Sequence, residues 1–184
     1  MGKRIIVIAF FLFSIFILPK DIFAVNIAGQ SARLSYSLNT ENGTDYLLKK
    51  LTIRRVLEKN DSPMVDQVDS FIETCNKYNL DCYLLPSIAG IESTFGKFIY
   101  PGSFNPFGWG RGLIQFKDWT DGIDTVGEGL RKNYIDKGAT TIEQIGAIYC
   151  EGNTWSGKVN YFMNQFAKEE EKINLFFSGD KVEL

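Results

Sequence analysis

The chain of 184 residues contains no histidine, and that absence excludes several kinds of chemistry. Ser-His-Asp and Cys-His nucleophilic catalysis, zinc peptidases of the HExxH type and c-type haem attachment all need an imidazole. The side chains that remain for acid–base work near neutral pH are those of Asp, Glu, Tyr and Lys. Any catalysis is therefore expected to depend on an aspartate or a glutamate.

Cysteine is nearly as scarce as histidine in this chain. Cys75, Cys82 and Cys150 do not follow the CxxC spacing of a metal site, and without histidine we expect neither a bound metal nor a cofactor. Cys75 and Cys82 are close enough in sequence to form a short disulfide in an oxidising compartment. Their Cα separation decides the outcome, so the bridged and the free states both stay open.

The chain also lacks an apolar run long enough to cross a bilayer as a helix. Lys3 and Arg4 precede an apolar run, Ile5–Leu18, and a short segment that ends at Ala24. The run has about 14 residues where a spanning helix needs about 20, and this layout is typical of a secretory signal peptide. We expect residues 1–24 to be removed, with an uncleaved anchor as the alternative. In both cases the remainder is expected to work outside the cytoplasm.

An excess of positive charge is missing as well. Once residues 1–24 are set aside, 17 basic and 21 acidic residues remain, a net charge of −4. No cluster of Lys or Arg is long enough to follow a phosphate backbone. The charge pattern therefore argues against nucleic acid as a partner.

What the chain does contain is a series of apolar residues at helical spacing. Residues 25–43 have no clear periodicity and are expected to form a poorly ordered lead-in, and residues 44–184 a single domain. Ser62 and Asp81 are suited to cap the second and third helices, and Gly96 to end the third. The predicted helices cover about 46–59, 63–78, the segment between Asp81 and Gly96, 122–134, 142–149 and 156–177.

One segment interrupts the helical pattern. Residues 97–117 are rich in Gly, Phe and Trp and contain two prolines. The glycines predict turns, and the alternating apolar residues of Leu113–Phe116 predict a short strand. We expect an ordered loop or a small hairpin inserted into a mainly α domain.

Glu92 is an acidic residue at the end of a predicted helix that is otherwise largely apolar. It follows the apolar face formed by Leu85, Ile88 and Ala89, in the last turn of its helix. The negative end of the helix dipole and apolar surroundings both favour the uncharged acid form of a carboxyl group there. Glu92 is thus a candidate general acid, and the alternative is a solvent-facing glutamate or one paired with a nearby Lys or Arg.

The segment around Glu92 carries a family resemblance. Residues 78–96, YNLDCYLLPSIAGIESTFG, resemble the signature of the lysozyme-like superfamily, which includes soluble lytic transglycosylases and autolysin-type glucosaminidases. In those families the glutamate of a Glu-Ser pair at the end of the helix is the catalytic acid. By this resemblance Glu92 has that role.

Later segments agree with this resemblance in order and spacing. NPFGWG at 105–110 followed by IQFKDWTDGI at 114–123 is similar to the glucosaminidase pattern of an Asn-x-Phe-Gly loop, a strand and a Trp-x-x-Gly-Ile helix start. GLIQ at 112–115 is similar to the Gly-Leu-Met-Gln element of the transglycosylases. AIY at 147–149 resembles the late segment whose tyrosine lines the cleft. The resemblance covers residues 60–166 and implies a mainly α, α+β lysozyme-like domain with the loop or hairpin at its cleft.

The resemblance implies an exported glycosidase that cleaves peptidoglycan, secreted, periplasmic or associated with the cell wall. Glu92 would protonate the glycosidic oxygen between N-acetylglucosamine and N-acetylmuramic acid units. The second step has three candidates: a carboxylate that activates water, the acetamido group of the substrate, or its C6 hydroxyl closing a 1,6-anhydro ring. Glu151 and Asp121 are the carboxylate candidates, and a helix cap near Gly122 is the alternative role of Asp121.

Other residues of these motifs have expected roles beside Glu92. Tyr149 would orient the acetamido group or carry a proton, with a packed core tyrosine as the alternative. Asn105 would bond saccharide amides or hold the turn. The expected saccharide-binding residues are Ser93, Asn105, Phe107, Trp109, Gln115 and Trp155.

Two questions of function stay open at this point. Where many transglycosylases have Tyr-Asn-Ala-Gly, this chain has YCEG at 149–152, so hydrolysis and lytic transglycosylation both remain. A non-catalytic module that binds peptidoglycan or a related amino-sugar polysaccharide is the competing class. A third is an assembly factor that opens the wall for a secretion apparatus. In each case a monomer is expected, with membrane contact only through an uncleaved leader.

Overall fold

The computed structural model describes residues 43–149 and 154–179. The expected leader, residues 25–42 of the expected lead-in and Glu151 lie outside the described residues. No helix in the described ranges is long and apolar enough to cross a membrane. The described chain forms these elements: α1 (Gly43–Lys59), η1 (Val65–Gln67), α2 (Val68–Tyr78), α3 (Leu84–Ser93), α4 (Trp119–Asn133), η2 (Ile135–Lys137), α5 (Ile142–Tyr149) and α6 (Trp155–Gly179).

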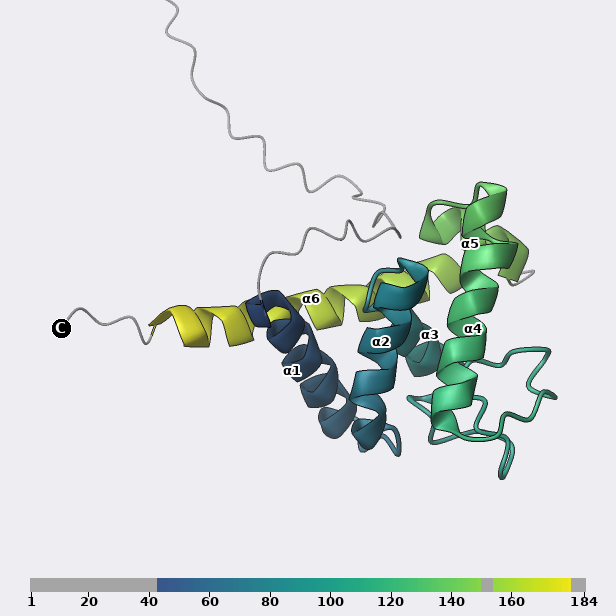
Figure 1. Ribbon diagram of the computed structural model, residues 1–184, viewed down its shortest axis with the longest axis horizontal. Helices are drawn as coiled ribbons and strands as arrows, with labels where there is room; N and C mark the ends of the chain where they lie inside the picture. Colours follow the sequence, from purple (N-terminus) through teal and green to yellow (C-terminus); the bar gives the residue numbers. More distant parts are fainter. Residues whose placement is uncertain (1–42, 150–153, 180–184) are drawn as a thin grey trace, which may run out of the picture.

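Helix α6 is the element against which most of the domain packs. It contacts α1, α3 and α5, while α4 packs on α2 and α2 on α1. Figure 1 shows α6 running across the other helices and extending beyond α1 at its C-terminal end. The largest fully buried side chains come from α2, α6 and the segment between α3 and α4: Phe71, Phe95, Phe107 and Phe166. The apolar core therefore joins α6 to the segment that follows Glu92, and the expected mainly α domain is confirmed.

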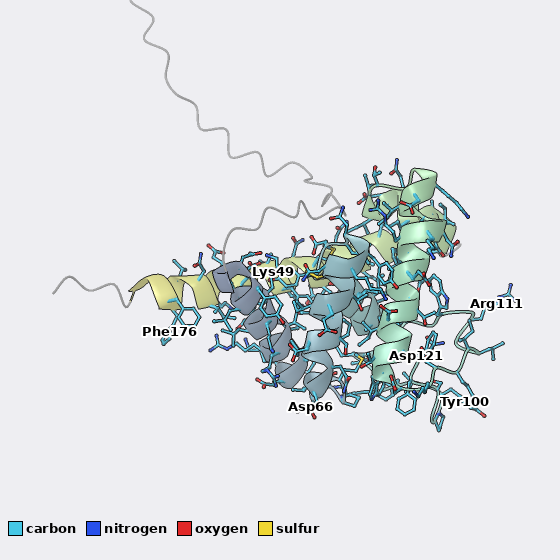
Figure 2. All side chains as sticks on the ribbon, in the orientation of Figure 1. Lys49, Asp66, Tyr100, Arg111, Asp121 and Phe176 are labelled. Carbon is cyan, nitrogen blue, oxygen red and sulfur yellow. A yellow bond between two sulfur atoms is a disulfide. The ribbon has the colours of Figure 1, made fainter. Side chains whose placement is uncertain are left out.

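The segment between α3 and α4 is an ordered loop. The predicted strand at Leu113–Phe116 was wrong: residues 94–118 contain no strand, and the Phe116 N–H makes a single bond of 2.8 Å to the Ser103 carbonyl. Gly108 and Gly112 have φ angles of 62° and 76°, so the chain coils too tightly for a ladder to form. Figure 2 shows Tyr100 and Arg111 at the outer edge of this loop.

Two helices start later than their predicted caps. The Ser62 hydroxyl donates to the Phe95 carbonyl at 2.7 Å, and α2 begins only at Val68, after the turn η1. Asp81 accepts the Tyr83 N–H at 2.8 Å, but Tyr83 is itself the N-cap of α3. The predicted caps therefore hold the turns that precede these helices, because serine and aspartate also bond the backbone two residues on.

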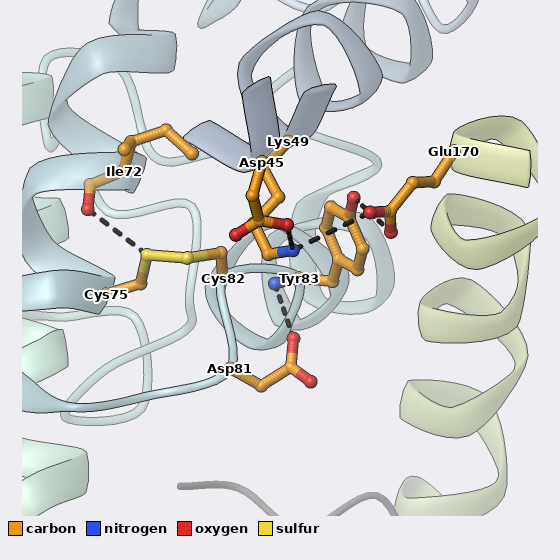
Figure 3. Close-up of a disulfide and its surroundings, with 8 residues drawn as sticks. All are labelled: Asp45, Lys49, Ile72, Cys75, Asp81, Cys82, Tyr83 and Glu170. Carbon is orange, nitrogen blue, oxygen red and sulfur yellow. Dashed lines mark hydrogen bonds and ion pairs between the residues drawn. A yellow bond between two sulfur atoms is a disulfide. The ribbon is translucent and has the colours of Figure 1, made fainter. Parts of the chain in front are cut away.

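A disulfide joins the end of α2 to the start of α3. Cys75 and Cys82 are bonded, with their Cα atoms 4.9 Å apart (Figure 3), which settles the alternative that the sequence left open. Between them Asn79 takes a left-handed conformation, with φ of 50°, and ends α2. The Leu80 N–H then bonds the Cys75 carbonyl at 2.9 Å. A backbone hydrogen bond and the disulfide thus both close this turn, and together they fix the position at which α3 starts.

A small polar cluster lies where α1, α3 and α6 meet. The Tyr83 hydroxyl donates to Glu170 of α6 at 2.7 Å, and Lys49 of α1 lies 3.6 Å from the same carboxylate (Figure 3). Burial raises the pKa of Asp81 at the edge of this cluster, partly opposed by the Tyr83 N–H and by Lys49. Three helices are therefore tied by polar contacts as well as by the apolar core.

Removal of the disulfide should lower the stability of the fold without changing its architecture. We expect the double substitution Cys75→Ala and Cys82→Ala to reduce the free energy of unfolding by about 2 kcal/mol. Without the cross-link the unfolded chain gains conformational entropy, which favours unfolding. Chemical denaturation of parent and variant under oxidising conditions measures this. Treatment of the parent with a reductant should give the same loss, and an unchanged midpoint in both experiments would contradict the prediction.

The substitution Asp81→Asn should remove a pH dependence of stability. In the folded protein the pKa of the Asp81 carboxyl group is raised above its ordinary value of 3.8. The contribution of this group to the stability of the fold is therefore fully present below pH 3.8, and it is lost as the pH rises through the folded-state pKa. An asparagine oxygen can still accept the Tyr83 N–H. We therefore expect the variant to equal or exceed the parent in unfolding free energy at neutral pH, as measured by denaturation across pH. A less stable variant at neutral pH would show that the charge favours folding.

Candidate active site

Glu92 lies one residue before the end of α3, and the chain turns sharply just beyond it. Thr94, Phe95 and Gly96 all have positive φ angles, of 51°, 58° and 85°. Left-handed conformations of non-glycine residues cost about 1–3 kcal/mol each, so packing has to hold them. The Phe95 ring, 1% exposed, supplies that packing. The position of Glu92 is thus set by a strained turn anchored in the core.

Ser93 joins this helix end to the loop. Its hydroxyl lies 2.8 Å from the Pro106 carbonyl and 3.0 Å from the Ala89 carbonyl, and it accepts the Gly96 N–H at 2.8 Å. The side chain is buried, with 3% of its residue exposed. The prediction that Ser93 binds saccharide was therefore wrong. Its hydroxyl is needed inside the protein, where it fixes the loop against α3.

Trp155, the first residue of α6, holds the Glu92 side chain from one side. Its indole N–H donates to Glu92 Oε1 at 2.8 Å. The indole is stacked on Tyr149, with ring centroids 4.8 Å apart, and the Tyr149 hydroxyl donates to the Phe107 carbonyl at 2.6 Å. The start of α6, the end of α5 and the loop are thereby connected to one carboxylate.

The loop approaches Glu92 from the other side at Gly108. A Cβ atom at this position would lie 3.2 Å from Glu92 Oε2, and the φ angle of 62° also favours glycine. The Glu92 side chain itself is exposed, so the predicted apolar surroundings were wrong. The carboxylate stands between a glycine and an indole and is open to solvent.

Asn105 holds the loop in shape. Its side-chain amide donates to the carbonyls of Trp109 at 2.8 Å and Ile114 at 3.0 Å, and its oxygen accepts the Trp109 N–H at 3.0 Å. The residue is 4% exposed. Of the two expected roles, the structure supports the one in which Asn105 holds the turn, and its predicted contact with saccharide is not available in this conformation.

Several of the aromatic rings predicted to stack on sugars are buried instead. Phe107 is 0% exposed and Trp155 4% exposed, so neither ring presents a face to a saccharide. Trp109 is half-buried and packs on Gly129, where a Cβ atom would lie 2.6 Å from its ring. These aromatics build the wall of the site, whereas Gln115 is exposed on the loop.

The two candidate second carboxylates differ in their placement. Helix α4 begins at Trp119, with Asp118 as N-cap accepting the Asp121 N–H at 2.8 Å, so the predicted start near Gly122 was late. Asp121 in turn accepts the Lys117 N–H at 3.0 Å and lines a polar hollow between α2 and α4. Its carboxylate therefore bonds the backbone just before the helix, whereas the cap role considered for Asp121 belongs to Asp118. Glu151 lies outside the described residues.

An open cavity of about 510 Å³ lies between α3 and the first turns of α6, and its lining from α3 consists of the two residues that precede Glu92 in the sequence. The sequence analysis did not identify it. The signal was present, because the residues from α6 and its preceding turn are three or four apart and share one helix face. The cavity is lined by Gly90, Ile91, Thr154, Gly157, Lys158, Tyr161 and Phe162. No group of three or more potential metal ligands occurs in the described part of the chain.

Substitution of Gly108 should disturb the Glu92 carboxylate, and Gly112 offers a matched control. Both glycines have positive φ, but a Cβ atom at Gly112 would meet nothing within 4 Å. We expect Gly108→Ala and Gly112→Ala each to lower the free energy of unfolding by about 1–2 kcal/mol. Only Gly108→Ala should shift the NMR signal of the Trp155 indole N–H, because only that methyl group displaces its acceptor. Equal shifts in both variants would refute the contact.

Comparison with known proteins bears on the fold. No protein-family model matches the chain, and no curated protein matches it. Among solved structures, the chain is similar to the crystal structure of S. aureus autolysin E in complex with the muropeptide NAM-L-Ala-D-iGlu. The two are 16% identical over 65% of this chain and 67% of that one, with a TM-score of 0.50. At this identity the likeness establishes the fold, a mainly α lysozyme-like domain.

Proposed function

We propose that this protein is an exported peptidoglycan-cleaving glycosidase in which Glu92 is the general acid. The bond it cuts joins N-acetylglucosamine and N-acetylmuramic acid units. The observation that carries the proposal is the placement of Glu92, exposed at the end of α3 and held by the Trp155 indole N–H at 2.8 Å. The likeness of the fold to an autolysin crystallised with a muropeptide supports peptidoglycan as the substrate class.

The geometry of Glu92 suits proton donation to a glycosidic oxygen. That oxygen is a poor leaving group until it is protonated, so an acid has to be both accessible and oriented. Trp155 holds Oε1, and Oε2 lies on the side where Gly108 leaves space. A polymer approaching from solvent would meet an oriented carboxyl group, and little reorganisation would be needed in the transition state.

Tyr149 is placed to support the second step. Its hydroxyl donates to the Phe107 carbonyl at 2.6 Å, and its ring stacks on Trp155. Because the Trp155 indole bonds Glu92, the Tyr149 ring is held close to the proposed acid. Because Asp121 is occupied at the start of α4, we propose either Glu151 or the substrate's own acetamido or C6 hydroxyl group as the second participant.

Exposed side chains just after α3 are better placed for sugar contact than the buried aromatics. Phe98 is 75% exposed and Tyr100 69% exposed, and Figure 2 shows Tyr100 pointing outward from the loop. The Phe98 N–H bonds the Ser93 carbonyl at 2.9 Å, which keeps this residue beside the end of α3. We propose that these two rings contact saccharide faces, a use typical of exposed aromatics next to a polar site.

The test of the function is the substitution Glu92→Gln. Glutamine retains an oxygen that can accept the Trp155 N–H, so we expect unchanged unfolding free energy together with a loss of peptidoglycan cleavage of at least about 100-fold. Mass spectrometry of the soluble products measures cleavage and identifies the reaction. Fragments ending in 1,6-anhydro-muramic acid would identify a lytic transglycosylase, and reducing ends a hydrolase. A variant that keeps most of its activity would remove Glu92 from the mechanism.

The same assay separates the remaining alternatives. A loss of about 100-fold in Glu151→Gln would identify Glu151 as the working base, and little change would indicate assistance by the substrate. Absence of soluble product from the parent chain, together with binding to peptidoglycan, would identify a saccharide-binding module.

A further inference from the structure

The C-terminal end of α6 exposes a group of apolar side chains. Leu175, Phe176 and Phe177 are 65%, 68% and 52% exposed, and together they are called the apolar tip. Figure 1 shows this end of α6 extending beyond α1, and Figure 2 shows Phe176 there. Three consecutive residues of a helix point in three different directions, so a single packing face could not bury all of them.

Cations gather beside the apolar tip, where α1 crosses α6. Two hollows of about 210 Å³ and 220 Å³ open between these helices. The basic residues that line them, called the basic face, are Arg54, Arg55, Lys59, Lys168 and Lys172. The acidic lining residues are Glu58 and Glu169, which gives the described lining a net charge of +3. Phe176 and Phe177 line the first hollow, so the basic face and the apolar tip form one continuous surface.

The buried carboxylate of Glu169 does not cancel the charge of the basic face. Its side chain is 7% exposed and lies 2.6 Å from the Lys59 ammonium. Arg55 and Lys172 each lie 3.6 Å from the same carboxylate. Three cations therefore share one acid, and their own side chains remain more than half exposed. The surface presented to solvent is positive, although residues 25–184 as a whole are acidic.

We propose that the basic face and the apolar tip dock this protein on the surface of an anionic lipid bilayer. The cations would lie among the headgroups, and the two phenylalanine rings would enter the boundary with the acyl chains. Exposed aromatic and aliphatic side chains next to Lys and Arg are typical of proteins that lie on such a surface. Lipid can surround all sides of the apolar tip, whereas a second protein helix would cover one side.

The proposal goes beyond the proposed function, because docking involves no residue of the candidate active site. Membrane contact was expected only through an uncleaved leader, and this surface provides a second route. Trp155, which bonds Glu92, is the first residue of α6. Phe176 lies near the other end of the same helix, about 30 Å away at the helical rise per residue. A docked molecule therefore keeps Glu92 uncovered.

The experiment measures binding to lipid vesicles by sedimentation. Residues 25–184 contain every described element, and they are used so that the expected leader cannot contribute. Vesicles of phosphatidylglycerol and phosphatidylcholine in equal amounts are compared with vesicles of phosphatidylcholine alone. We expect binding to the anionic vesicles to be at least about tenfold tighter and to weaken as the salt concentration rises.

An aromatic variant tests the apolar tip. Phe176→Ala combined with Phe177→Ala should weaken binding to the anionic vesicles by about tenfold or more, because lipid no longer covers two apolar rings. Both side chains are exposed, so the unfolding midpoint should stay unchanged. Phe98→Ala removes a ring that is 75% exposed on the loop, and this matched control should bind as the parent does.

A charge variant tests the basic face. Arg54→Gln combined with Lys168→Gln should weaken binding to the anionic vesicles by about tenfold, because cations near an anionic surface add attraction. Lys117→Gln combined with Lys137→Gln makes the same change in net charge just before and just after α4, and it should have little effect.

Other outcomes would overturn the proposal. These are no binding by the parent, equal binding to both kinds of vesicle, or equal losses in the control variants. Competition by soluble polyphosphate without any effect of the phenylalanine variant would identify an anionic polymer as the partner. A dimer in solution that the phenylalanine variant abolishes would identify a second copy of the chain. None of these measurements uses cleavage, so their failure would leave the glycosidase proposal intact.

Discussion

Helix α3 ends within one residue of Glu92, and the way it ends fixes the position of that carboxylate. The Ser93 hydroxyl takes part in bonds to Ala89, Pro106 and Gly96, so one buried side chain joins the helix, the turn and the loop. The turn itself uses left-handed residues that only tight packing around Phe95 can hold. Because these contacts hold the end of α3 against the loop, Gly108 of the loop lies next to the Glu92 carboxylate.

Helix α6 extends this constraint to the whole domain. Its first residue bonds Glu92, and Phe162 and Phe166 in its middle pack on Phe95, just after α3. Glu170 accepts a hydrogen bond from the Tyr83 hydroxyl just before α3. Both ends of α3 are thus fixed to one long helix, and the disulfide also fixes the start of α3 to α2. The contacts that stabilise the fold around α3 are therefore also the ones that fix the position of Glu92.

The aromatic residues near Glu92 form two groups, one buried in the protein and one exposed to solvent. Phe107, Trp155 and the half-buried Trp109 form the wall that orients the carboxylate, whereas Phe98 and Tyr100 stand in solvent on the loop. In a protein without histidine, this arrangement gives a single glutamate an accessible yet fixed position.

The sequence by itself predicted the helical pattern, including the bounds of the short helix 142–149, and it selected Glu92 as the candidate acid. Helical periodicity is local, so i, i+3 and i+4 spacing records it well. Burial is not local: Ser93, Asn105 and Phe107 look like cleft residues in the motif, yet each is covered by segments distant in sequence. The strand expected at 113–116 failed for the same reason, because a strand needs a partner and the glycine turns supply none. The closed disulfide, the indole on Glu92 and the cavity beside Lys158 were decided only when α3, the loop and α6 came together.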